Sequence, residues 1–331
     1  TRRSSDLLAT VGTGWIVGEF LKGVREAGGI CYTACYSRDQ QRGEAFAEEW
    51  GAQKVYTDLA QMAADEEIDA VYIASPNRLH YEQSKLFLQH GKHVICEKPI
   101  TVEPEELQEL QELAQQKNLI YIEALIGVYL PQMKVLQGAV ERLGPVHLAR
   151  FDFSQYSSKY PAYLRGELPN IFNPQMATGG WMDLGIYCLY PAIMLFGVPD
   201  HVHAHARFLS TGADGSGCVT LQYPDKTVVL TYSKTAQGTI GSEIQGEDGV
   251  IRIPHISKLI NMTLTPVGGQ EMPLSGPQEK YLQMAYEAAA FRDFIEQPEQ
   301  NKARYRYVSH LALNVSRVMK RAREEAGIYF E

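Results

Sequence analysis

Short apolar runs alternate with helical patterns along the first 124 residues of the chain. The apolar runs occupy residues 7–11, 30–36, 54–56, 69–75, 93–96 and 119–124. Polar residues do not interrupt them at every second position, which is typical of strands that are buried on both faces. This β-α alternation predicts an α/β fold with a doubly wound parallel sheet that carries helices on both faces.

The pattern changes after Ala124. A helical pattern at 132–142 leads to a strand pattern at 146–156, and a helical pattern follows at 181–197. Further strand patterns occupy 201–209, 217–223, 227–233, 242–253 and 261–267, and two amphipathic helical patterns occupy 281–297 and 307–327. We predict a first domain at residues 1–124 and a second α/β domain at 125–331. The second domain should hold a large, mostly antiparallel open sheet with one solvated or partner-covered face.

Length, charge and cysteine content narrow the class of protein. A chain of 331 residues is too long for one ordinary core, which agrees with two domains. The net charge of -8 argues against a nucleic-acid partner, and we interpret the basic stretch 304–324 as an amphipathic surface helix. No apolar run has the length of a membrane span, and residues 1–12 have no signal-peptide core. Five cysteines without paired spacing indicate free thiols, so we predict a cytoplasmic protein without a membrane partner.

The turn after the first predicted strand has the spacing G-x-G-x-x-V. Its residues are Gly12, Thr13, Gly14, Trp15 and Ile16, with Val17 where a small residue is usual. Bare backbone at the start of a helix lets a pyrophosphate approach the helix N-terminus. We therefore predict a dinucleotide site here, and a tight turn without a ligand is the alternative.

The second predicted strand ends at the residues that meet the adenosine ribose in such a site. Ser37 and Arg38 favour a 2'-phosphate, and hence NADP. Asp39 keeps NAD as the alternative, because an acidic residue here binds a free 2'-hydroxyl.

Polar residues also follow the fourth and fifth predicted strands. Ser75, Pro76, Asn77 and His80 follow one, and Glu97 and Lys98 follow the other. Open parallel sheets bind ligands at the carboxyl ends of their strands, so we expect these residues to contact the cofactor. The alternative is that Asn77 caps a helix and His80 lies on the surface.

Three ordered motifs resemble one known family. They are S-P-N-x-L-H at 75–80, E-K-P at 97–99 and G-G-W-M-D-L-G-I-Y at 179–187. The chain resembles, over nearly its whole length, the glucose-fructose oxidoreductase, inositol dehydrogenase and rhizopine-catabolism family (Gfo/Idh/MocA), and within it the dihydrodiol and sugar dehydrogenase branch. The resemblance implies an N-terminal Rossmann domain and a C-terminal domain whose open sheet builds homodimers or homotetramers.

The resemblance also implies roles for single residues. Lys98 is expected at the reacting alcohol and Glu97 near the nicotinamide ribose, with Pro99 in a bond that is often cis in relatives. Asp183 and Tyr187 fall on the D-x-G-x-H/Y element, and the Tyr is the proton donor proposed in the dihydrodiol branch. This chain departs from the pattern at Val17 and at residues 127–129, where relatives often carry an aromatic and a basic residue.

The chemistry of these residue types fits hydride transfer to or from an alcohol carbon. Such a reaction needs a group that moves the hydroxyl proton, and Lys98 and Tyr187 are the candidates. Asp183 and Tyr187 are four residues apart, so a helix that begins near Gly180 would present both on one face. Capping by Asp183 and packing by Tyr187 are the structural alternative.

We therefore predict an NADP-preferring oxidoreductase that acts on a hydroxyl or carbonyl of a small sugar, polyol or dihydrodiol-like substrate. Lys98 and Tyr187 would handle the proton, and Asp183 would orient Lys98 or a substrate hydroxyl. Two alternatives stay open: a non-catalytic nucleotide-binding regulator of the same fold, and a reductase of C=N or C=C bonds.

Two further segments carry residues with chemical potential. The long segment 152–174 contains Tyr156, Lys159 and Arg165, which can meet polar substrate groups or line a subunit contact. The histidines in 201–206 recur at every second residue. Without neighbouring cysteine or carboxylate ligands they favour a solvated strand face over a metal site, so we predict no metal.

Overall fold

The computed structural model describes residues 6–330. The chain divides into two compact units, with residues 1–129 and 279–313 in unit 1 and residues 130–278 and 314–331 in unit 2. Residues 279–313 thus group with the first unit, and the boundary after residue 124 stays a prediction. Residues 1–5, which belong to the segment expected to lack a signal peptide, lie outside the described part.

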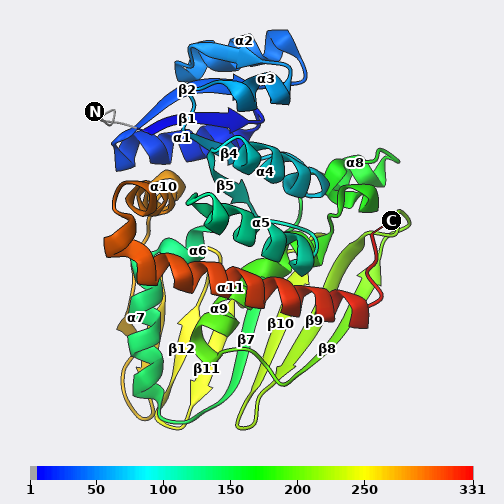
Figure 1. The fold of residues 1–331 in the computed structure, drawn as a ribbon. Helices are drawn as coiled ribbons and strands as arrows, with labels where there is room; N and C mark the ends of the chain where they lie inside the picture. Colours follow the sequence, from blue (N-terminus) through cyan, green and yellow to red (C-terminus); the bar gives the residue numbers. More distant parts are fainter. Residues whose placement is uncertain (1–5, 331) are drawn as a thin grey trace. The chain divides into compact units, whose positions relative to one another are not determined.

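Unit 1 is built on a six-stranded sheet in which every pair of neighbouring strands is parallel (Figure 1). The strands are β1 (Asp6–Val11), β2 (Ile30–Tyr36), β3 (Lys54–Tyr56), β4 (Ala70–Ile73), β5 (His93–Glu97) and β6 (Tyr121–Ala124). The helices are α1 (Trp15–Ala27), α2 (Gln40–Trp50), α3 (Leu59–Ala64), α4 (His80–Gln89), α5 (Pro104–Gln116), α6 (Ile126–Tyr129) and α10 (Lys280–Glu296). The predicted doubly wound sheet is confirmed.

The order of the strands in this sheet contains a topological switch point. The order is β3-β2-β1-β4-β5-β6, so the chain reverses its direction of winding between β1 and β4. Val11, Ile73 and Cys96, near the ends of β1, β4 and β5, are fully buried or nearly so. The carboxyl ends of β1 and β4 therefore lie side by side at the point where such sheets bind ligands.

Helix α10 packs against α1 of unit 1. A side chain at Gly23 would lie 2.8 Å from the backbone of Met284, so the two helices approach each other closely. This contact explains why residues near the C-terminus group with the first unit.

Unit 2 is built on an eight-stranded sheet in the order β14-β13-β12-β11-β7-β10-β9-β8. Its strands are β7 (Val146–Ser154), β8 (His201–Phe208), β9 (Asp214–Gln222), β10 (Thr227–Ser233), β11 (Ser242–Gly246), β12 (Gly249–Ile253), β13 (Thr263–Pro266) and β14 (Met272–Pro273). Its helices are α7 (Pro131–Val140), α8 (Tyr160–Leu164) and α9 (Ile186–Phe196). Only β7 and β10 pair in parallel, so the predicted, mostly antiparallel sheet is confirmed.

One face of this sheet is covered and the other is partly exposed. In β8 the buried Val202 and Ala204 alternate with the exposed His201, His203 and His205. The interpretation of these histidines as a solvated strand face is confirmed. Within residues 6–330 no three potential ligands gather as a metal site would require.

The last helix, α11 (Pro298–Glu325), contributes residues to both units. Val308, Leu311, Val315 and Val318 are buried, at the spacing of one helix face, which confirms the predicted amphipathic helix. None of the helices in the described part of the chain is both long and apolar enough to span a membrane.

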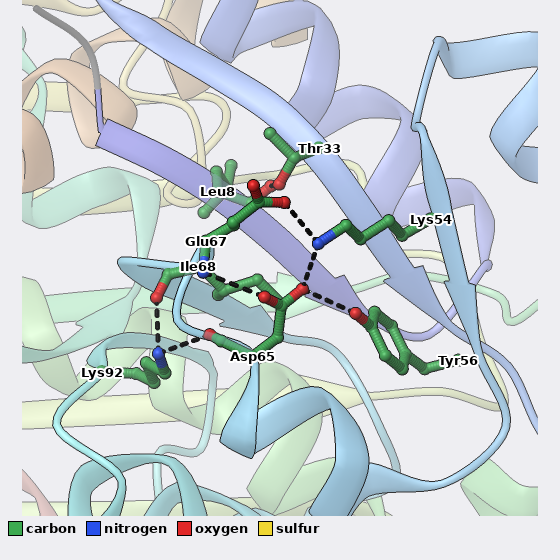
Figure 2. A network of polar contacts seen from close by, with 8 residues as sticks. All are labelled: Leu8, Thr33, Lys54, Tyr56, Asp65, Glu67, Ile68 and Lys92. Carbon is green, nitrogen blue, oxygen red and sulfur yellow. Dashed lines mark hydrogen bonds and ion pairs between the residues drawn. The ribbon is translucent and has the colours of Figure 1, made fainter. Parts of the chain in front are cut away.

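A polar network closes the edge of the parallel sheet between β3 and α3 (Figure 2). The Asp65 carboxylate accepts hydrogen bonds from Lys54 Nζ and from the Tyr56 hydroxyl, both at 2.6 Å. Below it, the buried ammonium of Lys92 donates to the carbonyls of Asp65 and Ile68, each at 2.7 Å. Burial alone would raise the pKa of Asp65, but the hydrogen bonds from Lys54 and Tyr56 outweigh it and lower the pKa to about 2.

This network predicts a pH-dependent contribution to stability. Because the pKa of Asp65 is lower in the folded protein, the contribution is fully present above the unfolded pKa and is lost as the pH falls from about 4 to about 2. Asp65→Asn should cost about 2 kcal/mol of unfolding free energy at neutral pH. Urea titrations across this pH range measure it, with Glu66→Gln on the exposed side of the same loop as control. A cost for Asp65→Asn that stays constant down to the lowest pH would contradict the assignment.

Candidate active site

The phosphate turn begins where β1 ends. Gly12 has a φ of +113°, and a side chain there would lie 3.0 Å from the Ala74 carbonyl at the end of β4. Its amide donates to the Tyr36 carbonyl at the end of β2, at 3.1 Å. The turn is therefore locked between two neighbouring strands, and both its conformation and its space require glycine.

Gly14 is different, because nothing within the protein requires glycine there. Its φ is -82°, and a side chain would meet no atom within 4 Å. It caps helix α1, where no side chain accepts from the first backbone amides and no acidic residue lies in the first turn. The pyrophosphate of a dinucleotide would fill the open space beside Gly14 and accept hydrogen bonds from the uncapped amides of α1.

The other predicted residues of the turn differ in how far they are exposed. Thr13 and Ile16 are half-buried, and Trp15 is exposed with the Lys280 ammonium 4.3 Å from the centre of its ring. Val17 is fully buried, so the larger residue in the third position packs within the unit.

Among the residues after β2, two side chains accept hydrogen bonds from the backbone and two arginines are exposed. Ser37 is buried, and its hydroxyl accepts from the Asp39 amide at 3.2 Å. Asp39 caps α2, since its carboxylate accepts from the Arg42 amide at 2.9 Å. Arg38 and Arg42 are exposed, and Arg42 Nη2 lies 3.4 Å from the carbonyl of Thr13 in the phosphate turn. The sequence interpretation missed Arg42, although an arginine one helical turn from Arg38 is the signal that would have found it.

The structure corrects one alternative for the residues after β4. His80 is fully buried, with Nδ1 2.8 Å from the Pro99 carbonyl and Nε2 2.8 Å from the Ser75 carbonyl. A surface position for His80 is therefore wrong, and the helical turn that begins at Asn77 follows the half-buried Pro76. Burial lowers the pKa of His80, although its hydrogen bonds to the two carbonyls oppose the change. His80 joins the loop after β4 to the loop after β5.

Glu97, at the end of β5, is held from the neighbouring strand. The Tyr72 hydroxyl on β4 donates to Glu97 Oε1 at 2.5 Å, and the Lys98 amide donates to Oε2 at 3.3 Å. Burial raises the pKa of Glu97, while the Tyr72 hydrogen bond and the Lys98 charge oppose the rise. Lys98 is half-buried and precedes Pro99 through a cis peptide bond.

Glu123 is a second acidic residue at the same end of the sheet, and the sequence interpretation missed it. It lies near the end of β6, is almost fully buried, and accepts from the Ile100 amide at 2.8 Å. It thereby fixes the backbone that follows Lys98 and Pro99. Its signal in the sequence was a charged residue at the end of an apolar run, which is the feature that drew attention to Glu97.

In unit 2, Asp183 lies on a helical turn that differs from the prediction. Residues Trp181–Gly185 form a π-helix, and α9 follows at Ile186. The side chain of Asp183 pairs with the buried ammonium of Lys234, directly after β10. Gly180, and not Asp183, is the N-cap of this turn. No local pattern in the sequence indicates Lys234, which is 51 residues away from Asp183.

Another aspartate supports the start of the π-helix. Asp214, on β9, accepts from the Trp181 amide at 2.7 Å. Burial raises the pKa of Asp214 to about 6, although this hydrogen bond opposes the change. Gly179 has a φ of +149°, and a side chain there would collide with the Asp214 carboxylate. Gly179 and Asp214 together explain why the motif before Asp183 begins with glycine.

Tyr187 lies in the first turn of α9. Its ring is half-buried and meets the edge of Phe153, on β7, with 5.5 Å between the ring centres. Because β7 and β10 run in parallel, Phe153 and Lys234 lie at the same end of the sheet. In unit 2, Asp183 and Tyr187 thus contact residues at the same end of β7 and β10. Lys98 belongs to unit 1.

The segment between β7 and the π-helix is partly ordered by its own contacts. Arg165 pairs with Glu167 at 2.7 Å, so its charge is balanced within the segment. Tyr156 and Lys159 are exposed, and Tyr156 packs against Tyr160 of α8. A substrate role for Tyr156 or Lys159 stays a prediction.

Two family models match the chain. The model described as the oxidoreductase family with an NAD-binding Rossmann fold (GFO_IDH_MocA) matches residues 7–125, and the model of the GFO/IDH/MocA C-terminal domain matches residues 139–252. These matches agree with the resemblance inferred from the three motifs.

Named relatives and solved structures add detail. The chain is 37% identical over 322 residues to the scyllo-inositol 2-dehydrogenase (NADP(+)) IolU of Bacillus subtilis. This match covers 97% of this chain and 97% of that relative. The chain is also 37% identical, with the same coverage, to the uncharacterized oxidoreductase YgjR of Escherichia coli. The crystal structure of KijD10, a 3-ketoreductase from Actinomadura kijaniata in complex with NADP and TDP-benzene, has the same fold. Its TM-score is 0.84 at 18% identity, with coverage of 97% of this chain and 98% of that chain.

Proposed function

Since the chain belongs to the Gfo/Idh/MocA family of NAD(P)-binding oxidoreductases, we propose that it interconverts a secondary hydroxyl of a cyclic polyol and the corresponding ketone with NADP. The choice of a cyclic polyol as substrate is supported by one observation. The chain is 37% identical, along 97% of both chains, to a dehydrogenase named for scyllo-inositol and NADP. A cyclic polyol lies within the sugar, polyol and dihydrodiol range that the motifs indicate.

We assign the proton chemistry to Lys98 and Tyr187. The nicotinamide ring supplies the hydride acceptor or donor when the cofactor is bound. As charge develops on the substrate oxygen, an ammonium or a phenol stabilises it and moves the proton. Asp183 accepts a hydrogen bond from a hydroxyl of the polyol and orients it. Glu97, anchored by Tyr72, contacts the cofactor ribose.

We propose that the residues after β2 select NADP. Asp39 uses its carboxylate to cap α2, which supports a 2'-phosphate over a free 2'-hydroxyl at this position. Ser37, Arg38 and Arg42 supply a hydroxyl and two guanidinium groups, and Arg42 lies beside the phosphate turn. The residues of the turn fit the pyrophosphate, and Ser75, Pro76, Asn77 and the loop held by His80 line the nicotinamide half.

Removing the two arginines tests this cofactor assignment. Arg38→Ala and Arg42→Ala should each weaken NADPH binding by about 10- to 100-fold, because a hydrogen bond to a charged group contributes about 1.5–3 kcal/mol. NADH binding should stay unchanged, since NADH lacks the 2'-phosphate. Fluorescence titration measures both, with Arg252→Ala, an exposed arginine of unit 2, as control. Equal losses for NADPH and NADH, or tighter NADH binding to the wild type, would contradict the choice of NADP.

A substrate screen tests the reaction itself. Formation of NADPH is followed by absorbance with scyllo-inositol, myo-inositol, glucose and a trans-dihydrodiol as substrates. We expect the highest kcat/KM with an inositol. Turnover of the dihydrodiol alone would reassign the substrate class, and cofactor binding without any turnover would favour the regulator.

We also propose that the protein forms homodimers or homotetramers through the partly exposed face of the unit 2 sheet. Along β10, the half-buried Thr227, Val229 and Thr231 alternate with the buried Val228 and Leu230, so this face is available to a second copy. Light scattering of the purified protein measures the assembly.

All five cysteines are free thiols, which supports a reducing, cytoplasmic location.

A further inference from the structure

Lys234 is a buried cation that the catalytic proposal does not use. It follows the last residue of β10, and its ammonium donates to Asp183 Oδ2. Only 7% of the Lys234 side chain is exposed, against 25% of that of Asp183. The Asp183 carboxylate is therefore more accessible than the ammonium that holds it.

The backbone of Lys234 is fixed on both sides. Its amide donates to the Gly215 carbonyl on β9 at 2.8 Å, and its carbonyl accepts from the Ser157 amide at 2.9 Å. The lysine side chain therefore starts from a rigid point of the sheet, at the place where the segment after β7 begins. A side chain held in this way can define the position of a partner.

The ion pair needs an explanation other than stability. Burying two charges costs about as much as their attraction returns, and apolar replacements of such pairs are often neutral or stabilising. Asp183 also sits on a π-helix, a local departure from α-helical geometry that often accompanies functional sites. A carboxylate on such a turn gains a fixed position from a partner that is itself held by the sheet.

We propose that Lys234 is a positioning residue, which holds the Asp183 carboxylate oriented toward the polyol hydroxyl that it binds. This inference rests on the proposed function, because it assumes that Asp183 meets substrate. It assigns to Lys234 no contact with substrate or cofactor. The ammonium acts through Asp183, and its loss should leave a misplaced carboxylate.

Lys234→Ala, tested in the full-length protein, should lower kcat/KM by about 10²-fold, which is the usual cost of misplacing a reacting or orienting group by about 1 Å. NADPH binding, measured by fluorescence, should not change. Lys234→Arg should keep part of the activity, because it restores a cation beside Asp183. Lys134→Ala, an exposed lysine on α7 of the same unit, is the matched control and should behave as wild type.

Chemical rescue separates positioning from a purely structural role. Ethylammonium should restore activity to Lys234→Ala in a saturable way, and tetramethylammonium at equal ionic strength should not, because it donates no hydrogen bond. Asp183→Asn should not be rescued, and adding Lys234→Ala to it should cost little more, because the two residues act as one unit.

The outcomes distinguish this inference from the proposed function. An active wild type with an equally active Lys234→Ala variant overturns the role of Lys234 alone. Lost activity that neither Lys234→Arg nor ethylammonium restores, with a lowered melting temperature, also overturns it in favour of a structural role. A wild type that turns over no polyol overturns the proposed function and this inference together.

Discussion

Lys98→Met is expected to lower kcat by about 10³-fold, in the middle of the range of about 10²- to 10⁴-fold that a proton-transferring side chain contributes. Methionine keeps much of the length and apolar stem of lysine but carries no charge and no proton. The Glu97 carboxylate, which precedes Lys98 at the end of β5, keeps its hydrogen bond from the Tyr72 hydroxyl in this variant. NADPH binding should therefore stay close to wild type, which fluorescence titration measures beside steady-state kinetics.

The control for this variant is Lys117→Met, an exposed lysine at the end of α5 in the same unit. It should change neither kcat nor cofactor binding. If Lys98→Met kept kcat within about tenfold of wild type, less than the smallest usual contribution of general acid-base catalysis, Lys98 would have no part in moving the proton.

Tyr187→Phe is expected to lower kcat by about 10²-fold while leaving the fold intact. Phenylalanine keeps the ring that packs against Phe153, at 5.5 Å between ring centres, and removes only the hydroxyl. We expect this loss because, in the proposed function, the hydroxyl donates the proton to the forming alcohol or a hydrogen bond to its oxygen. Kinetics in both directions, together with thermal unfolding, test the change.

The pH profile of kcat separates the two roles of the phenol. If Tyr187 transfers the proton, the limb of the profile that belongs to it should disappear in Tyr187→Phe. If Lys98 transfers it, the limb should stay while the rate falls. Tyr307→Phe, on the exposed part of α11, is the control and should match wild type. Full activity of Tyr187→Phe would leave Lys98 as the proton-transferring group.

Local patterns in the sequence were sufficient to predict the strands that carry the unit 1 site. Cys96 and Ile73 end apolar runs because parallel strands are buried on both faces, and the polar residues after them lie at the carboxyl edge of the sheet. Glu97 and Lys98 were found by this argument. Glu123, near the end of β6, has the same signal, a charged residue at the end of an apolar run.

The alternatives that the sequence left open depend on contacts between distant segments. His80 suited either the surface or the cofactor site, and its buried contacts with Ser75 and Pro99 exclude the surface. Asp39 suited a ribose hydroxyl by its residue type, and the structure shows that its carboxylate instead caps α2 by accepting from the Arg42 amide. In both cases the residue type permits two roles, and only the position of a partner distinguishes them.

The sequence by itself determined the order of strands and helices, the position of the phosphate turn and the motifs around Lys98 and Asp183. Each of these depends on residues that are near one another in the chain, through burial period, turn chemistry or motif spacing. The tertiary structure decided that Lys234 pairs with Asp183, that Asp214 supports the π-helix and that residues 279–313 pack with unit 1. These contacts join segments far apart in the chain, and no local pattern encodes which distant side chain compensates a buried charge.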